Sequence, residues 1–169
     1  RKKLRDQFFL VKENADVYDR VYWIVDFDVI LKETRECRPG GKSRLVELGE
    51  YMMELRERDN VRILINNPCL EFWFLLHFKE TSHFYGDCSS VCRALKHVSL
   101  FSDYVKNEQY YKKNDGDIYL KLKPFQENAI RNSSKLGKFD FSLPDSAKSE
   151  MFKLFVELGV GAKITPPAL

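Results

Sequence analysis

Two short apolar runs in the first half of the chain predict two strands. Residues 21–25 (VYWIV) and 61–65 (VRILI) are rich in β-branched and aromatic side chains. Runs of this kind are typical of strands that are buried on both faces of a parallel sheet. Between them, apolar residues recur at helical spacing from residue 45 to residue 58, and Ser43 is a suitable N-cap for that helix. A strand, a helix and a strand in this order predict a right-handed crossover and a parallel pair.

The remainder of the chain is predicted to be mainly helical. Asn67 and Pro68 form a helix start signal, with Asn67 as the cap and Pro68 at the first helical position. They precede residues 69–78, which are apolar on nearly every side and therefore predict a buried helix. Further helices are expected at residues 89–98, 101–111, 117–136 with an interruption at Pro124, and 144–158. Before the first strand, the apolar island at residues 8–11 fits either the end of a helix or a strand.

Length and composition indicate one soluble domain with an ordinary core. The chain has 169 residues, of which 44% are hydrophobic and 31% charged, which excludes a disordered or fibrous chain. The longest apolar stretch, residues 70–78, contains Glu71 and His77 and is too short to span a membrane. A net charge of +3 permits a polyanionic partner without requiring one. Four irregularly spaced cysteines without a signal peptide predict a reduced, cytoplasmic compartment.

Asp26 and Asp28 are the first candidates for chemistry, because they end the first predicted strand. Ligands gather at the carboxyl ends of parallel strands, and side chains two apart on a strand point to the same side. The two carboxylates would then repel each other unless a cation such as Mg²⁺ were bound between them. The alternative is that both aspartates cap a loop, since Asp readily begins turns.

Glu71 is the second candidate, because it shares a helical stripe with Phe74, Leu75 and Phe78. A carboxylate buried among apolar groups is costly unless it has a partner. One interpretation is that the free N–H groups of the first helical turn stabilise it. The other is that Glu71 faces the strand ends beside the aspartates as a third acidic group. The sequence does not separate these two interpretations.

Cysteine and histidine offer a further alternative, a zinc site drawn from Cys69, His77, Cys88 and Cys92. The sequence has no C-x₂-C pair, and the usual spacing of zinc ligands is missing. His77 is better explained as a hydrogen-bonded histidine in the core.

Basic residues interleaved with tyrosines occur in the second half of the chain. Such a run can follow a phosphate backbone and stack bases, and it can equally be a solvated helix face. The candidate nucleic-acid-binding residues are Lys112, Lys113, Lys121, Lys123 and Arg131.

Residues 66–78 (NNPCLEFWFLLHF) resemble the signature of the RloB-like family, a strand followed by an N-P-C-x-E-x-W-x-L-L-H-F helix. Residues 18–28 (YDRVYWIVDFD) are similar to its second signature, a hydrophobic strand that ends in D-x-D. Residues 129–130 and 151–158 also look like family positions, so the resemblance extends over most of the chain. The resemblance implies an α/β fold with a Toprim/Rossmann-like parallel sheet core and a helix-rich C-terminal half.

The resemblance also implies a setting and a chemistry. Toprim-like domains are used by metal-dependent nucleases and topoisomerases, and RloB-like proteins are encoded at restriction or phage-defence loci, often beside an RloA-type ATPase. Asp26 and Asp28 would hold Mg²⁺ or Mn²⁺, and Glu71 would be a further acidic ligand or a group behind the ligands. Toprim domains carry a catalytic glutamate, followed by glycine, on an earlier strand, and no such stretch precedes Asp26 here.

We therefore expect a single RloB-like domain over residues 1–169 that lacks an upstream strand, with a sheet core and acidic site in 1–80 and a helical extension in 81–169. The leading functional hypothesis is a Mg²⁺-dependent nuclease that hydrolyses RNA or DNA in bacterial phage defence, with Asp26, Asp28 and Glu71 as its catalytic acidic residues. The alternative is a non-catalytic module that binds nucleic acid or the ATPase partner. No membrane partner is expected, and the sequence leaves oligomerisation open.

Overall fold

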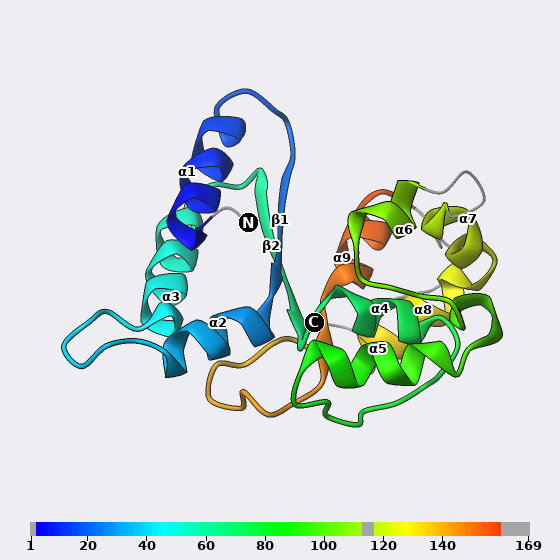
Figure 1. Ribbon diagram of the computed structural model, residues 1–169. Helices are drawn as coiled ribbons and strands as arrows, with labels where there is room; N and C mark the ends of the chain where they lie inside the picture. Colours follow the sequence, from blue (N-terminus) through cyan, green and yellow to red (C-terminus); the bar gives the residue numbers. More distant parts are fainter. Residues whose placement is uncertain (1–2, 113–116, 160–169) are drawn as a thin grey trace.

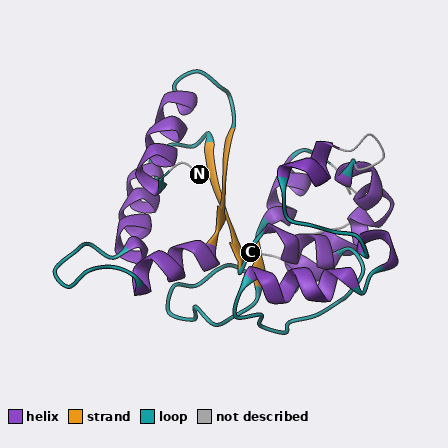
Figure 2. Cartoon of the chain, in the orientation of Figure 1, coloured by secondary structure: helices purple, strands orange, loops and turns teal. Residues whose placement is uncertain are grey.

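The computed structural model describes residues 3–112 and 117–159, in which two groups of helices flank a narrow sheet (Figures 1 and 2). The first part of the chain forms α1 (Leu4–Ala15), β1 (Val21–Asp26), α2 (Phe27–Arg35), α3 (Arg44–Leu55) and β2 (Val61–Asn67). The second part forms α4 (Leu70–Leu76), α5 (Cys88–Lys96), η1 (Ser99–Phe101), α6 (Glu108–Lys112), α7 (Ile118–Leu122), η2 (Lys123–Phe125), α8 (Gln126–Ser134), β3 (Lys148–Ser149) and α9 (Met151–Glu157).

The sheet is mixed, with the strand order β1-β2-β3 in the described part of the chain. β1 and β2 are parallel over their whole length, in a register that pairs Val21 with Val61 and Asp26 with Asn66. This confirms the parallel pair predicted from the sequence. β3 is a two-residue strand that adds antiparallel to the end of β2, and the sequence pattern did not predict it.

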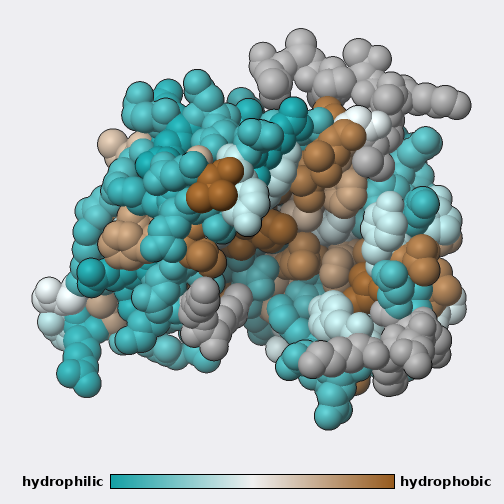
Figure 3. Space-filling view, turned by 90° about the horizontal axis from the view of Figure 1, so that it is seen from above, coloured by the Kyte–Doolittle hydropathy of each residue, from teal (hydrophilic) through white to brown (hydrophobic). Residues whose placement is uncertain are grey.

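Separate hydrophobic cores lie on the two sides of the sheet. α1, α2 and α3 pack with alternate residues of β1, among them Trp23 and Val25, and with Ile65 of β2. Leu64 of β2 faces the other way, into a core built from α4, α5, α8 and neighbouring segments. Seen from above, hydrophobic residues gather in the middle of the molecule, between more hydrophilic surroundings (Figure 3). β2 therefore contributes buried residues to both cores, and Tyr22 of β1 also packs against the second core.

β1 is buried on one face rather than on both. Its residues alternate between buried and more exposed, and Ile24 keeps 40% of its surface accessible. The prediction of full burial is wrong because the helices of the first group cover one face of β1, whereas the other face borders a cavity that includes Ile24.

Several helix boundaries differ from those expected. The apolar island at residues 8–11 lies inside helix α1, and a helix, α2, begins directly after β1 where a loop was expected. The predicted helix at 101–111 is replaced by η1 and α6, with an irregular segment between them. The helix at 117–136 is divided by η2 around Pro124, as predicted, and Gly137 ends it with a positive φ of 73°.

Asn66 and Asn67, at the end of β2, hydrogen-bond to the segment that contains β3. Asn67 lies in the strand, and its Nδ2 donates to the carbonyl oxygens of Pro144 and Ser146 at 2.6 and 2.8 Å. Asn66 Oδ1 accepts a hydrogen bond from the Ser149 hydroxyl at 2.6 Å. The prediction that Asn67 caps the next helix is therefore wrong, because both side chains hold the segment that forms β3.

None of the helices in residues 3–112 and 117–159 is long and apolar enough to cross a lipid bilayer.

Candidate functional site

The candidate site lies where the carboxyl ends of β1 and β2 meet. Asp26 is the last residue of β1, and Asp28 lies in the first turn of α2. Glu71 lies in the first turn of α4, which begins three residues after β2 ends. Because the parallel register places Asp26 beside Asn66, the acidic residues of both segments arrive at the same edge of the sheet.

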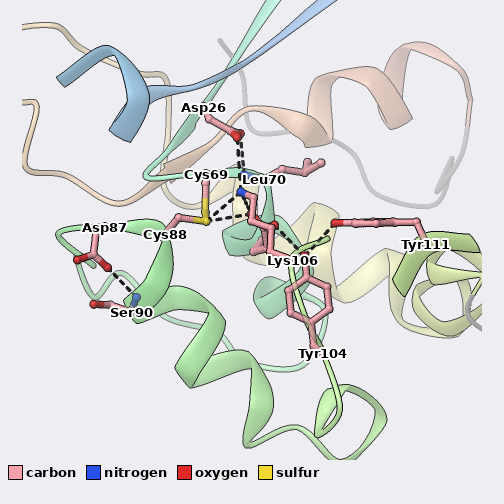
Figure 4. Close-up of a disulfide and its surroundings, with 10 residues drawn as sticks. Asp26, Cys69, Leu70, Asp87, Cys88, Ser90, Tyr104, Lys106 and Tyr111 are labelled. Carbon is pink, nitrogen blue, oxygen red and sulfur yellow. Dashed lines mark hydrogen bonds and ion pairs between the residues drawn. A yellow bond between two sulfur atoms is a disulfide. The ribbon is translucent and has the colours of Figure 1, made fainter. Parts of the chain in front are cut away.

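Lys106 joins two of these carboxylates (Figure 4). Its Nζ lies 2.8 Å from Glu71 Oε2 and 3.7 Å from Asp26 Oδ2. Glu71 is only 2% exposed, whereas 44% of the Lys106 side chain is accessible. Burial alone would lower the pKa of Lys106, but the hydrogen bond and charge of Glu71, followed by the charges of Asp26 and Asp28, outweigh it and raise that pKa. Lys106 therefore stays charged in the middle of the acidic group.

Asp26 also caps helix α4. Its Oδ1 accepts a hydrogen bond from the backbone N–H of Leu70 at 3.0 Å, while Cys69, the N-cap residue, makes no side-chain cap of its own. A carboxylate at this position satisfies one of the free N–H groups of the first turn. Asp26 thus connects the end of β1 to the start of α4, where it caps a helix and not the loop that the capping alternative proposed for both aspartates.

Asp28 reaches the site differently from the prediction. The two aspartates do not share one side of a strand, because the chain turns into α2 directly after Asp26. The Asp28 backbone N–H donates to the Pro68 carbonyl at 2.9 Å, which holds this turn against the end of β2. Burial, and next the negative charge of Asp26, raise the pKa of Asp28. Its buried Oδ1 has no hydrogen-bond partner among the described residues.

Two tyrosines complete the polar network around Glu71. The Tyr104 hydroxyl donates to Glu71 Oε1 at 2.8 Å and lies 2.8 Å from the Tyr111 hydroxyl. Burial is the main cause of the raised pKa of both phenols. Both oxygens of Glu71 therefore have partners, which accounts for a carboxylate buried among apolar groups. The interpretation in which Glu71 faces the strand ends beside the aspartates agrees with this geometry.

Cys69 and Cys88 form a disulfide next to Glu71, which contradicts the expectation of four reduced cysteines. The sequence spacing concealed this pair, because the two sulfurs are brought together by the packing of α4 against α5. Cys88 Sγ lies 3.1 Å from both Glu71 Oε2 and Lys106 Nζ. Cys37 and Cys92 are free thiols.

A cavity of about 380 Å³ borders the site. Its lining includes Asp26, Glu71, Lys106 and Tyr111 from the network, together with Glu33 of α2. Lys106, whose side chain is 44% accessible, is thus open to a molecule that enters from the exposed face of β1, whereas Glu71 stays buried behind it.

His77 is a core residue, as predicted. It is 1% exposed, and its Nδ1 lies 2.9 Å from the Trp73 carbonyl oxygen. Because His77 follows the last turn of α4 and Glu71 lies in the first, the histidine stands at the opposite end of the helix from the acidic site. Burial lowers the pKa of His77 to about 4.

The predicted basic residues that the structure describes are distributed over α7, η2 and α8. Lys121 Nζ lies 5.4 Å from the centre of the Tyr110 ring, and Lys123 Nζ lies 5.8 Å from that of Tyr119. Arg131 is exposed and donates to Asn128 Oδ1 at 2.8 Å. The Lys112 side chain and Lys113 lie outside the described part of the chain. Pairs of a cation with a tyrosine ring agree with either a stacking surface or a solvated face.

Sequence reasoning missed Lys106 and Tyr104, and it named Tyr111 only as part of the basic run with interleaved tyrosines. All three lie in a range that was expected to be one continuous helix, and nothing in the local pattern distinguishes them. Tyr104 and Lys106 meet Glu71 through contacts that span 33 and 35 residues of sequence. Tyr104 and Tyr111 are seven residues apart, a spacing that could have indicated two side chains on the same helical face. The same spacing is common on helices that carry no functional site.

A comparison with known protein families gives a match over nearly the whole chain. The RloB-like protein family model matches residues 2–158. The chain belongs to the RloB-like protein family. No curated protein and no solved structure matches it. In this RloB-like chain, residues 18–28 contribute Asp26 and Asp28, and residues 66–78 contribute Cys69 and Glu71. The segments that carry the resemblance are therefore the ones that meet at the sheet edge.

Proposed function

We propose that this RloB-like protein is a Mg²⁺-dependent nuclease that hydrolyses phosphodiester bonds of RNA or DNA in bacterial phage defence. The observation that carries the proposal is the convergence of Asp26 and Glu71 on the Lys106 ammonium at the wall of a cavity, with Asp28 near enough to interact electrostatically with Asp26 and Lys106. Acidic groups at the carboxyl edge of a parallel pair are also what a Toprim-like domain requires, and that fold is part of the proposal.

Asp26 and Asp28 are the residues that would hold the metal. Carboxylate oxygens are the ligands that Mg²⁺ prefers, and Mg²⁺ usually takes one or two of them together with water and phosphate oxygens. Among the described residues, the buried Oδ1 of Asp28 has no hydrogen-bond partner, which fits such an ion, and burial followed by the charge of Asp26 raises the Asp28 pKa. A bound Mg²⁺ or Mn²⁺ would stabilise negative charge on the phosphoryl group and activate a water molecule.

Lys106 and Glu71 act together beside the metal ligands. Glu71 keeps Lys106 protonated and directs its ammonium to the cavity, and Tyr104 fixes the second oxygen of Glu71. A fixed ammonium at this position would bind a phosphate oxygen of the substrate. Glu71 is thus a positioning residue, which is the role that the family resemblance left open for it.

The exposed Lys123 and Arg131 would contact the nucleic-acid backbone at a distance from the reacting phosphate. Their contribution would be electrostatic and independent of sequence, and it would fall with salt concentration. Lys121, which lies over the Tyr110 ring, would support base stacking on that side.

The test is nuclease activity on single- and double-stranded RNA and DNA with Mg²⁺, for the wild type and for Asp26→Asn and Asp28→Asn. Replacing either aspartate should lower the rate of hydrolysis by about 100-fold or more. Losses of this size follow when one group that stabilises the charge of the transition state is removed. Asp140→Asn is the matched control, because Asp140 is a surface residue whose partner is Ser142. Equal activity in the aspartate variants and the control would refute the proposal.

The existing partners of the acidic residues favour a second function. Lys106 already neutralises the charges of Asp26 and Glu71, and Asp26 also caps α4. In that case the acidic group is structural, and the protein is a non-catalytic module that binds nucleic acid or an RloA-type ATPase. Calorimetric titration with Mg²⁺ and Mn²⁺ separates the two functions. Absence of metal binding, together with stable capture of the co-encoded ATPase, would favour the binding module.

A further inference from the structure

Cys69, Glu71 and Cys88 form a compact group of potential ligands for a thiophilic metal. One ligand atom from each residue lies within 4.8 Å of those of the other two. Cys69 is the N-cap residue of α4, and Cys88 is the first residue of α5, so both sulfurs are attached to well-packed helices. Glu71, two residues after Cys69, adds a carboxylate from the first turn of α4.

We propose that the reduced protein binds Zn²⁺ through Cys69, Cys88 and Glu71, and that the disulfide seen in the structure is the oxidised form of this site. The Zn²⁺ ligands differ from the Mg²⁺ ligands proposed above, Asp26 and Asp28, although Glu71 and Lys106 adjoin both sites. The inference does not depend on nuclease activity. Two thiolates and a carboxylate suit Zn²⁺, whereas Mg²⁺ requires oxygen ligands. The spacing rule that argued against zinc does not apply here, because the ligands come from two packed helices.

The conversion between the two forms is a balanced thiol–disulfide exchange. Two molecules of a thiol reductant donate two electrons and two protons to the Cys69–Cys88 bond, giving two protein thiols and one disulfide of the reductant. Binding of Zn²⁺ then releases both thiol protons to solvent, because cysteine coordinates as the thiolate. Three protein ligands leave a fourth position for water or for another ligand.

The Lys106 ammonium occupies the position that a Zn²⁺ ion would take, so the metal has to displace it. The Lys106 ammonium, 2.8 Å from Glu71 Oε2 and 3.1 Å from Cys88 Sγ, stands where a cation would be bound. A surface pocket that includes Cys88 and Cys92 reaches the same lysine. Because 44% of the Lys106 side chain is accessible, the ammonium can turn into solvent when a metal takes its place.

The experiment uses Co²⁺ as a spectroscopic probe, followed by displacement with Zn²⁺ in the presence of a chromophoric chelator. Protein reduced with a phosphine, which does not itself bind the metal through sulfur, should bind one Co²⁺ and show a thiolate-to-cobalt absorption band. The oxidised protein should show no such band. Cys69→Ser and Cys88→Ser should each lose the band, while Cys37→Ser, which removes a free thiol of the first helical group, should keep it.

The Zn²⁺ affinity of Lys106→Met gives a further test, because this affinity would not change if the two cysteines had only a structural role. Removing a positive charge about 3 Å from two ligand atoms should tighten Zn²⁺ binding by about 10-fold. Asp28→Asn should lower nuclease activity by about 100-fold or more and leave the cobalt band unchanged, so failure of one proposal is distinguishable from failure of the other. Reduced wild-type protein without the band, or a band that survives in both Cys69→Ser and Cys88→Ser, would overturn the zinc site. Circular dichroism establishes that each variant is folded.

Discussion

Replacing Lys106 with methionine should destabilise the protein by about 2 kcal/mol. Methionine keeps most of the apolar stem of lysine, so the change removes mainly the charge. Glu71 is 2% exposed and would lose the ammonium at 2.8 Å, while its hydrogen bond from Tyr104 would remain. Leaving one member of a buried pair without its partner costs about 3–5 kcal/mol. A salt bridge on the surface contributes about 0–1 kcal/mol. Because the Lys106 side chain is partly accessible, the expected loss for the Lys106–Glu71 pair lies between the buried and the surface value.

Urea denaturation at neutral pH measures this effect as a change in the free energy of unfolding. Lys135→Met is the matched control, because Lys135 pairs with Glu80 at 2.7 Å on the surface, with 52% and 61% of the two side chains accessible. That variant should change stability by about 0.5 kcal/mol or less. The double variant Lys106→Met with Glu71→Gln should recover part of the loss, since it removes the stranded charge. A Lys106→Met variant as stable as Lys135→Met would refute the idea that Lys106 neutralises a buried Glu71.

Three other substitutions test the remaining electrostatics and the disulfide. Burial and the neighbouring Asp26 raise the pKa of Asp28, so the folded state keeps its proton to a higher pH than the unfolded state, and stability falls as pH rises between the two pKa values. Asp28→Asn should therefore increase the free energy of unfolding at neutral pH and remove that slope; a loss of stability would contradict this. Burial lowers the pKa of His77 from 6.5 to about 4, so its contribution is complete above pH 6.5 and is lost as the pH falls toward 4. His77→Gln should flatten the pH dependence of unfolding in this window, and an unchanged slope would argue against a neutral buried imidazole. Cys88→Ser opens a disulfide with a sequence separation of 19 and should cost about 3 kcal/mol without reductant. The difference from the wild type should disappear when both proteins are reduced, and a difference that persists would assign the loss to packing.

Periodicity predicted the framework of the fold because its elements are locally encoded. Both strands of the parallel pair, helix α3 with its Ser43 cap and the division near Pro124 follow from short stretches of sequence. The one-sided burial of β1 did not follow, because an apolar run carries no information on which faces its neighbours cover. β3 was missed for the same reason, since a two-residue strand exists only through its hydrogen bonds to β2.

The candidate site shows the same division. Asp26 and Glu71 could be selected from the sequence because each stands out locally, one after a strand and the other on an apolar stripe. Their convergence follows from the parallel register, which places the end of β1 beside the end of β2. The side of α2 on which Asp28 lies could not be predicted, because the pattern indicated a loop there. Lys106 had no local signal at all.

The sequence by itself determined the two strands of the parallel pair, helix α3, the acidic residues that stand out near the strand ends, and the resemblance to the RloB-like family. Those properties depend on neighbours along the chain, through side-chain periodicity, caps and motif spacing. Only the tertiary structure decided that Lys106 neutralises Glu71 and Asp26 and that Cys69 meets Cys88. The contacts of Glu71 depend on the packing of α4 against segments that lie 17 to 35 residues further along the chain, where local pattern gives no information.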